Sequence, residues 1–344
     1  MAGVGRSDPL THLSAHERAL VRPGPPPRRV EPQLATRAAS IPRGPGWIAE
    51  RKLDGVRLHV HLEADALRLL TRTGRDRAPN LPELAAPLRA LGPAQLVADA
   101  EVVALVDGRE RFQQVLRRIA PQSVANPAPP DVAVFLYLFD LLHLEGMDLR
   151  DVPLEGRKRV LRTLRFQEPV RFVDHLAGDL DVAFHLACDQ EWEGLIVKRA
   201  DLPYRPGRTS SWRKLVCARS GRFLVGGWTS PRGRRTGVGA LLVGSPTSQG
   251  LRYDGRVGSG LEAPTLAALA EHLPTIERVE PPFANPPADR DLRWAIPHLV
   301  VELRHLGRTD EGRLRQPTLV RLRPDLDAGD LRSSEREEGP VRSN

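Results

Sequence analysis

The sequence predicts an α+β protein built from two domains. Its 344 residues are enough for two hydrophobic cores of ordinary size. Up to about residue 217, short alternating strands are interspersed with segments of helical periodicity. Near residue 218 the pattern changes to short strands separated by glycine-rich turns, with one helix among them. We therefore expect domains at 31–217 and 218–328, between terminal tails at 1–30 and 329–344.

Both tails are expected to be disordered. Residues 1–30 have few apolar side chains and include a run of arginine and proline at 22–29. Such a composition buries too little apolar surface to offset the entropy lost on ordering. A basic arm that contacts phosphate is the alternative for this segment. Residues 329–344 are rich in charge, and the same argument applies to them.

The first domain is expected to alternate strands and helices. Residues 58–62 alternate apolar and polar side chains and form a hairpin with residues 67–70. The further elements expected in chain order are a helix at 81–91, a strand at 96–105, a helix at 112–119, a proline-rich loop at 121–130, a buried strand at 132–142, helices at 153–164 and 182–188, and a strand at 195–197. Lys158 is then most simply a solvated residue of a charged helix.

The second domain has the pattern of a small Greek-key barrel. Its expected elements are strands at 222–228, 239–243, 251–257 and 298–304, with a helix at 263–272. Several short strands and one helix within about 110 residues are typical of an OB-fold.

The charge of the chain favours a polyanionic partner. The formal net charge is +8 and the isoelectric point is about 10.2. An arginine-rich composition with no such partner is the alternative. No run of about 18 apolar residues occurs, so a membrane-spanning helix is not expected.

Lysine is scarce in this chain, with four lysines against 47 arginines. Arginine stays protonated and cannot act as an amine nucleophile, so the remaining lysines are candidates for chemistry. Lys52 lies in a Lys-x-Asp-Gly-x-Arg sequence, Lys198 ends the run that begins at Glu193, and Lys214 follows Trp212 by two positions. This distribution predicts covalent catalysis by an amine.

Further motifs accompany the lysines in a fixed order. They are Arg72-Thr73-Gly74, Asp99-Ala100-Glu101, Tyr137-Leu138-Phe139-Asp140, the lysine motifs at 193–198 and 212–214, and the arginine-rich segment 315–325. Each motif alone is common, but the ordered set is specific. Over residues 32–327 the chain resembles the covalent nucleotidyltransferase superfamily of ATP-dependent DNA ligases and mRNA capping enzymes. It looks closest to the ligase domain of bacterial end-joining DNA ligases.

The resemblance implies a nucleotidyltransferase (adenylation) domain of antiparallel sheets with flanking helices, followed by a C-terminal OB-fold barrel. ATP would donate AMP to Lys52. The implied ATP-binding residues are Glu50, Lys52, Arg57, Arg72, Glu101, Phe139, Glu193, Lys198 and Lys214. The residues implied in catalysis are Lys52, Lys198, Lys214, Arg323 and Asp325, and those implied in DNA binding are Arg72, Arg208, Arg315 and Arg321.

The residue types suit this chemistry by themselves. An amine that attacks the α-phosphate of ATP forms a phosphoramidate and expels pyrophosphate. Glu101 and Glu193 offer the hard oxygen ligands that Mg²⁺ (or Mn²⁺) prefers beside a triphosphate. The ordinary alternatives are that Lys52 pairs with Asp54 at a strand end, that the two glutamates pair with arginines, and that Phe139 is a core aromatic.

The nucleotide donor is expected to be ATP, held without a Walker-A loop. The sequence has no G-x-x-x-x-G-K-[ST] motif. Its two cysteines cannot form the four-thiolate zinc site that NAD-dependent bacterial ligases possess. ATP is therefore favoured over NAD.

Two positions depart from the family pattern. A second lysine usually follows Lys214 by two residues, where this chain has Val216, and another usually follows Asp325, where it has Leu326. Loss of one charge-assisted contact costs about 1.5–3 kcal/mol, or roughly 10- to 100-fold in rate. The enzyme would be slow unless a nearby arginine such as Arg213 substitutes.

These observations predict an ATP-dependent DNA ligase that seals breaks with a 5′-phosphate and a 3′-hydroxyl in DNA repair or recombination. We expect a cytoplasmic, nucleoid-associated monomer that acts on nicked or broken double-stranded DNA, alongside end-joining or repair proteins. An RNA ligase or capping-type enzyme is one alternative. A DNA-end-binding protein with a degenerate ligase fold is the other, because of Val216 and Leu326.

Overall fold

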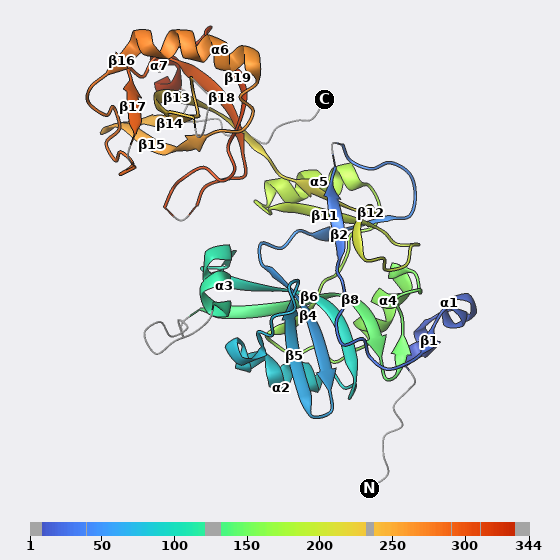
Figure 1. The fold of residues 1–344 in the computed structure, drawn as a ribbon. Helices are drawn as coiled ribbons and strands as arrows, with labels where there is room; N and C mark the ends of the chain where they lie inside the picture. The colour runs from blue at the N-terminus through green and yellow to red at the C-terminus, as the bar shows by residue number, and fades with distance from the viewer. Residues whose placement is uncertain are drawn as a thin grey trace. The chain divides into compact units, whose positions relative to one another are not determined.

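The structure is a computed structural model (Figure 1). It describes residues 9–38, 40–120, 132–231, 237–289, 291–309 and 311–333. The predicted loop at 121–130 lies outside these residues. The chain divides into two compact units, residues 1–215 and 216–344, close to the predicted boundary.

The larger sheet of the first unit contains the predicted hairpin. Its strands are β1 (Arg22–Pro23), β4 (Val56–Glu63), β5 (Ala66–Thr71), β6 (Leu96–Val106), β7 (Arg109–Glu110), β8 (Ala133–Leu144), β9 (Met147–Asp148) and β10 (Val170–Phe172). The order is β1-β9-β8-β6-β4-β5, with β7 beside β6 and β10 beside β8. The pairings are antiparallel except that of β10 with β8, which is parallel.

A second, four-stranded sheet lies in the same unit. Its order is β2-β12-β11-β3, and its strands are β2 (Gln33–Arg37), β3 (Trp47–Arg51), β11 (Gly194–Arg199) and β12 (Gly207–Val216). The expectation of antiparallel sheets is only partly correct, because β12 pairs with β2 in parallel. Only β11 was predicted, since the other three strands are rich in polar and small residues and lack apolar alternation.

Short helices flank the two sheets. They are η1 (Pro9–His12), α1 (Ala15–Ala19), η2 (Ala78–Asn80), η3 (Pro82–Leu84), α2 (Ala85–Ala90), α3 (Phe112–Ile119), α4 (Leu154–Arg162) and α5 (Leu180–Asp189). The predicted helices at 112–119, 153–164 and 182–188 are confirmed as α3, α4 and α5. The helix predicted at 81–91 is divided into η3 and α2.

The larger sheet has an apolar face and a buried polar face. Successive side chains of a strand point to opposite faces, so Leu58 and Val60 of β4 enter the main core while His59 and His61 do not. The same polar face carries three more buried side chains, which are those of Asp99, Asp140 and His143. Burial of polar groups is costly unless they have partners, and this face supplies the partners that organise the site.

The prediction of disordered tails is wrong for the described parts of both tails. Ser14 and Glu17 form a capping box that starts α1, and Leu13 is buried in the main core. The few apolar residues of this segment therefore find a core that composition alone does not reveal. At the other end α7 (Ala328–Ser333) buries Leu331 in a cluster of the second unit. Residues 1–8 and 334–344 are outside the described residues.

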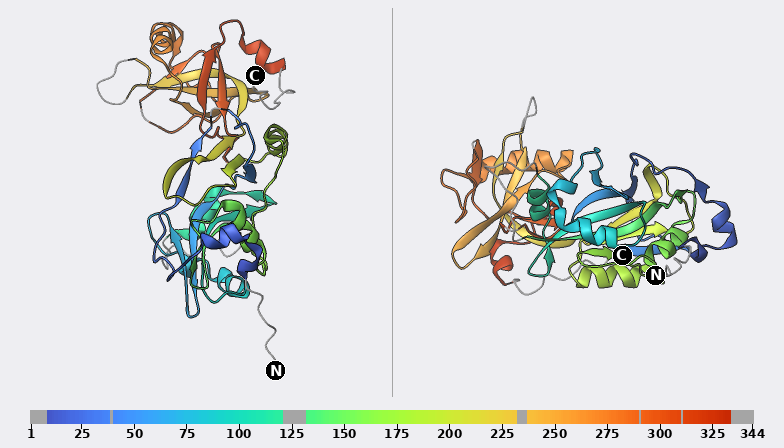
Figure 2. Two further views of the ribbon diagram at one scale, coloured as in Figure 1. Left: turned by 90° about the vertical axis from the view of Figure 1, so that its right-hand side faces the viewer. Right: turned by 90° about the horizontal axis from the view of Figure 1, so that it is seen from below.

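The second unit is the predicted OB-fold barrel (Figure 2). Its elements are β13 (Arg219–Thr229), β14 (Ala240–Thr247), β15 (Gly250–Val257), α6 (Ala263–His272), η4 (Leu273–Ile276), β16 (Glu277–Arg278), β17 (Leu292–Ala295), β18 (Val300–His305), β19 (Thr318–Leu322) and α7. Strand β13 pairs with β14 and β18, β14 pairs with β15, and β18 pairs with β19. A parallel bridge between Ser259 and Thr318 joins the end of β15 to β19 and closes the ring.

None of the helices in the described parts of the chain is long and apolar enough to cross a bilayer.

Candidate active site

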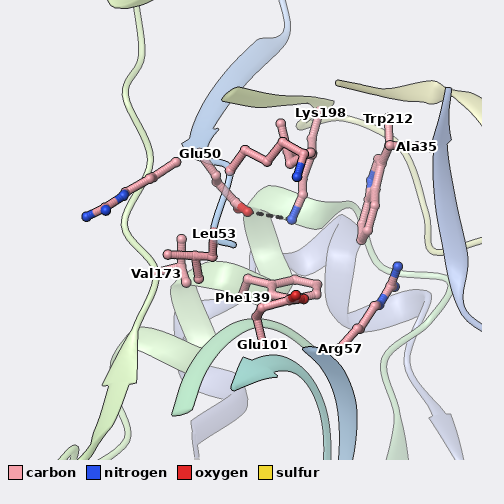
Figure 3. Close-up of a pocket in the computed structure, with 12 residues that line it drawn as sticks. Ala35, Glu50, Leu53, Arg57, Glu101, Phe139, Val173, Lys198 and Trp212 are labelled. Atoms are coloured by element: carbon pink, nitrogen blue, oxygen red, sulfur yellow. Dashed lines mark hydrogen bonds and ion pairs between the residues drawn. The ribbon is translucent and has the colours of Figure 1, made fainter. Parts of the chain in front are cut away.

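A cavity of about 150 Å³ lies between the two sheets of the first unit (Figure 3). The larger sheet supplies Arg57 from β4, Glu101 from β6 and Phe139 from β8, and the smaller sheet supplies residues from all four of its strands. The lining residues are Ala35, Glu50, Arg51, Lys52, Leu53, Arg57, Glu101, Phe139, Val173, Ile196, Lys198 and Trp212. Six of the predicted ATP-binding residues are therefore brought together: Glu50, Lys52, Arg57, Glu101, Phe139 and Lys198.

Lys52 lies directly after β3, at the side of this cavity. Its backbone N–H donates to the carbonyl oxygen of Gly194 (2.9 Å), which ties the loop to the start of β11. Its Nζ is 2.6 Å from Oε2 of Glu193, and both side chains are partly exposed. An amine can act as a nucleophile only where a reactant can reach it, and this amine is open to solvent and belongs to a residue that lines the cavity.

The loop that follows Lys52 is held against β6 and β7. A Cβ atom on Gly55 would lie 2.2 Å from the carbonyl oxygen of Val102, so any side chain there would clash. Close approach of the backbone, and not a positive φ, is the reason for this glycine. Glu110 accepts a hydrogen bond from the backbone N–H of Asp54 (2.9 Å) and pairs with Arg51 (3.0 Å).

Arg57 is fixed by a closed network of hydrogen bonds. Its Nε donates to Oδ1 of Asp99 (2.8 Å), and a second guanidinium nitrogen donates to the other oxygen. A third donates to the carbonyl oxygen of Gln33 (2.6 Å), and Tyr204 donates to Asp99 (2.9 Å). Although burial alone would raise the pKa of Asp99, the Arg57 charge holds it well below its usual range. The guanidinium therefore enters the cavity in one orientation.

Glu101 faces Arg57 across the β4–β6 ladder and lines the cavity. Burial raises the pKa of its carboxyl to about 8, against the opposing charges of Arg57 and Lys52. The negative charges of Asp99 and Glu193 act in the same direction as burial. A carboxyl in this environment gains from any cation that enters the cavity.

Two carboxylates accompany the cavity: Glu101 lines it, and Glu193 contacts Lys52, which also lines it. Within the described residues, no group of three or more acidic, histidine or cysteine side chains is arranged to hold a metal ion. Mg²⁺ usually needs only one or two carboxylates, with phosphate and water oxygens completing its shell. The site therefore suits a metal that arrives with a triphosphate, and does not suit a protein-only metal cage.

Lys198 and Lys158 share one buried carboxylate, that of Glu50. Lys198 Nζ donates to Oε2 of Glu50 (2.5 Å), the contact drawn in Figure 3, and Lys158 Nζ donates to Oε1 (2.6 Å). The prediction that Lys158 is a solvated helix residue is wrong, because its side chain is only 2% exposed. Although burial alone would raise the pKa of Glu50, the two ammonium groups hold it below its usual range. Burial lowers the pKa of Lys198.

Aromatic rings form one wall of the cavity. Phe139 and Trp212 meet edge to face, with ring centroids 6.1 Å apart, and Lys198 Nζ lies 4.3 Å and 4.2 Å from the two centroids. Phe139 is 8% exposed and also belongs to a small core with Val97 and Tyr204. Phe139 is therefore a core aromatic that also lines the cavity, and its contact with adenine stays a prediction.

The remaining predicted residues lie elsewhere. Lys214 belongs to β12 but does not line the cavity. Arg72 is exposed in the turn after β5, where Arg29 donates to its carbonyl oxygen (3.0 Å), and the exposed Arg208 donates to the carbonyl oxygen of Ala35 (3.2 Å).

Four predicted residues belong to the second unit, and three of them form one ionic cluster at its surface. Arg323 donates to Asp325 (2.8 Å), and Arg321 donates to Glu302 (2.9 Å). The hydrogen bond from Arg323 lowers the pKa of Asp325 to about 2. Arg315, in the loop before β19, donates its backbone N–H to the carbonyl oxygen of Gly307 (2.9 Å).

Sequence reasoning missed two residues that organise the site. Lys158 could have been found, because the scarcity of lysine that singled out the other three applies to it equally. Tyr204 had no comparable signal, since a lone tyrosine in a polar segment has many ordinary explanations.

Comparison with known proteins agrees with this geometry. The family described as "ATP dependent DNA ligase domain" matches residues 32–215, and the "ATP dependent DNA ligase C terminal region" matches residues 234–326. The multifunctional non-homologous end joining protein LigD of Pseudomonas aeruginosa is 37% identical over 326 residues, which cover 92% of this chain and 38% of that protein. This chain thus spans well under half of that relative's length.

Two solved structures are similar over nearly the same region. The ligase domain of M. tuberculosis LigD is 34% identical, with a TM-score of 0.51 over 88% of this chain and 98% of that one. A mycobacterial DNA ligase D complexed with ATP and MES is also 34% identical, with a TM-score of 0.50 and the same coverage. The chain belongs to the ATP-dependent DNA ligase family.

Proposed function

We propose that this chain seals breaks in double-stranded DNA through a covalent AMP intermediate on Lys52. The observation that carries the proposal is the position of the Lys52 amine beside a cavity that also holds Arg57, Glu101, Lys198 and two aromatic rings. A nucleophilic amine, fixed cations and a stacking surface are the parts that transfer of a nucleotide requires.

In the first step Lys52 Nζ, as a neutral amine, attacks the α-phosphorus of ATP. The new N–P bond forms as the P–O bond to pyrophosphate breaks, and pyrophosphate leaves with the electron pair. Glu193, 2.6 Å from Nζ, orients the amine and offers an acceptor for its proton. In the second step the 5′-phosphate of DNA takes the AMP from Lys52, and in the third the 3′-hydroxyl displaces the AMP.

The cavity residues take distinct roles in this proposal. Phe139 and Trp212 provide the apolar surface for the adenine, and Arg57 with Glu101 contacts the ribose. Lys198 and Lys214 contact the α-phosphate as compact charges. Glu193 would hold Mg²⁺ (or Mn²⁺), with Glu101 as a second ligand where it does not contact the ribose, and the metal would supply positive charge beside the phosphates.

The second unit and the exposed arginines would serve pyrophosphate and DNA. Arg323 and Asp325 act on the leaving pyrophosphate. Arg72, Arg208, Arg315 and Arg321 bind DNA phosphates, so DNA binding weakens steeply with salt. The likeness to LigD supports a role in end joining, with other repair proteins bringing the enzyme to breaks.

The proposal is tested with ATP labelled at the α-phosphate and Mg²⁺, followed by a denaturing gel. We expect label on the wild-type protein and none on Lys52→Arg, since guanidinium is not a nucleophile at neutral pH. Circular dichroism of the variant would show that its fold is kept.

The labelled protein is then mixed with nicked DNA or with nicked RNA, and the strand that is sealed distinguishes a DNA ligase from an RNA ligase. Labelling by GTP in place of ATP would indicate a capping-type enzyme. Absence of label on the wild type, with salt-sensitive binding to DNA ends, would indicate a binding protein in which Val216 and Leu326 have ended catalysis. Labelling of Lys52→Arg at the wild-type level would show that Lys52 is not the nucleophile.

A further inference from the structure

We propose that Lys158 is a positioning residue whose buried charge leaves Lys198 free to bind a phosphate of the nucleotide. The inference rests on the proposed function, in which Lys198 contacts the α-phosphate. Lys158 itself does not line the cavity and would touch neither ATP nor DNA.

The geometry places Glu50 between the two lysines. One carboxylate oxygen accepts from Lys158 and the other from Lys198, at 2.6 Å and 2.5 Å. All three side chains are buried, with exposures of 2–3%. Lys158 also donates to the carbonyl oxygen of Val173 (2.7 Å), a cavity residue, so it connects α4 to two sides of the cavity.

The charges of this group do not cancel, because two ammonium groups share one carboxylate. The adjacent buried acid, Asp140, is already satisfied by two hydrogen bonds from Arg157 (2.7 and 2.8 Å). It therefore does not neutralise the second lysine. With both lysines protonated, the group around Glu50 carries one net positive charge, and of its two ammonium groups only that of Lys198 belongs to a cavity residue.

Removal of Lys158 would change what Lys198 can do. Glu50 and Lys198 would then form a closed neutral pair, and a phosphate could recruit Lys198 only by leaving a buried carboxylate without a partner. An uncompensated buried charge is strongly unfavourable. With Lys158 in place, Glu50 remains paired when Lys198 turns to the phosphate. Lys158 therefore lowers the cost of phosphate binding without contacting it.

The test compares ligands with and without phosphates. Calorimetry would measure binding of ATP and of adenosine to the wild type and to Lys158→Met, which keeps the length of the side chain and removes its charge. Loss of one charge-assisted contact predicts that ATP affinity falls about 10- to 100-fold relative to adenosine. Equal losses of affinity for ATP and adenosine, or a loss of thermal stability with both affinities unchanged, would show that Lys158 has only a structural role. Either result would overturn the proposal.

Arg162→Met is the matched control. Arg162 lies one turn further along α4, over the same Phe172 ring as Lys158, but its ion-pair partner is the exposed Asp174. Arg162→Met removes the same charge from the same helix but leaves the pairs of Glu50 intact. Its ratio of ATP to adenosine affinity should therefore match that of the wild type. If the affinity ratio of Arg162→Met fell as far as that of Lys158→Met, the effect would come from the loss of any positive charge on α4, and the proposal would be overturned.

A charge-conserving variant keeps the test valid if Lys158→Met does not fold. Lys158→Arg retains a positive charge beside Glu50, so its ratio of ATP to adenosine affinity should match that of the wild type. A ratio about 10- to 100-fold lower in folded Lys158→Arg would overturn the proposal. Labelling of the wild type with α-labelled ATP, run alongside, reports on the proposed function separately from this inference.

Discussion

The charged groups that support the first unit's cavity from behind lie inside the protein, whereas part of the ionic cluster of the second unit lies at its surface. Arg157 and Asp140 are fully buried, as are Lys158, Glu50 and Lys198 to within a few per cent. In the second unit the side chains of Arg321 and Asp325 are 63% and 59% exposed, while those of their partners Glu302 and Arg323 are 19% and 15% exposed. Buried pairs resist separation because each partner loses its solvation, whereas exposed pairs exchange partners at little cost.

This difference fits the work proposed for each unit. A nucleotide site gains from charges that already hold their orientation, since no reorganisation is needed when the phosphates arrive. An exposed arginine such as Arg321 can exchange its carboxylate partner for a phosphate. The comparison between buried and exposed charge can be tested in four ways.

The largest contrast is expected between Arg157→Met and Arg321→Met. Loss of Arg157 leaves Asp140 buried and unpaired, which should lower the free energy of unfolding by about 3–5 kcal/mol. Loss of Arg321 should leave the free energy of unfolding unchanged within error. Urea unfolding followed by circular dichroism measures both. Similar losses in the two variants would contradict the comparison.

Acid should destabilise the polar face of the larger sheet through His61. Burial, with the charge of Arg68, lowers the pKa of His61 to about 4 from an ordinary value near 6.5. The unfolded chain therefore binds more protons between these values, and stability is lost as the pH falls from about 6.5 to 4. The loss from this group amounts to about 3 kcal/mol at most.

His61→Gln, which cannot be protonated, provides the control for this effect. Unfolding free energies of the wild type and the variant, measured between pH 7 and pH 4, should diverge in slope. Parallel curves would show that His61 does not titrate in this range.

Alkali should destabilise the cavity through Glu101. Burial raises its pKa to about 8 in the folded protein, so the folded state holds the extra proton between about 4.5 and 8. Stability from this group is present below pH 4.5 and is lost as the pH rises through 8. Glu101→Gln should therefore be more stable than the wild type at pH 9, by about 1–3 kcal/mol.

The same variant should lose adenylation, because the amide cannot replace the carboxylate as a metal ligand. Thermal unfolding at pH 5 and pH 9, without metal, would separate the two effects. Equal melting temperatures for wild type and Glu101→Gln at pH 9 would contradict the assignment.

The smallest effect on stability is expected for Asp325→Asn. Asp325 is exposed, and its hydrogen bond from Arg323 holds its pKa near 2, but solvent and salt screen that contact. The melting temperature should be unchanged in low and high salt, while the rate of adenylation falls. A lower melting temperature together with an unchanged adenylation rate would place Asp325 in the structure of the barrel and not in catalysis.

The main strands and helices could be predicted where side-chain pattern follows burial. The hairpin of β4 and β5 alternates apolar and polar side chains, β6 is a mostly apolar run buried on both faces, and α3 has helical periodicity. Strands β2, β3 and β12 could not be predicted in this way, because polar strands are held by backbone pairing with partners far along the chain. The prediction of a disordered N-terminal tail failed for the same reason, because Leu13 is stabilised by a core that other segments of the chain build.

By itself, the sequence determined the family to which this chain belongs. The scarce lysines, the acidic residues and their order predict a nucleotidyl-transferring site, because the reactive groups are specified by residue type and local motif. Only the tertiary structure decided how these groups pair. Glu50 lies 108 residues from Lys158 and 148 from Lys198, and no local pattern predicts that their charges meet. Partners of buried charges are chosen by the packing that removes them from water, which depends on the whole fold.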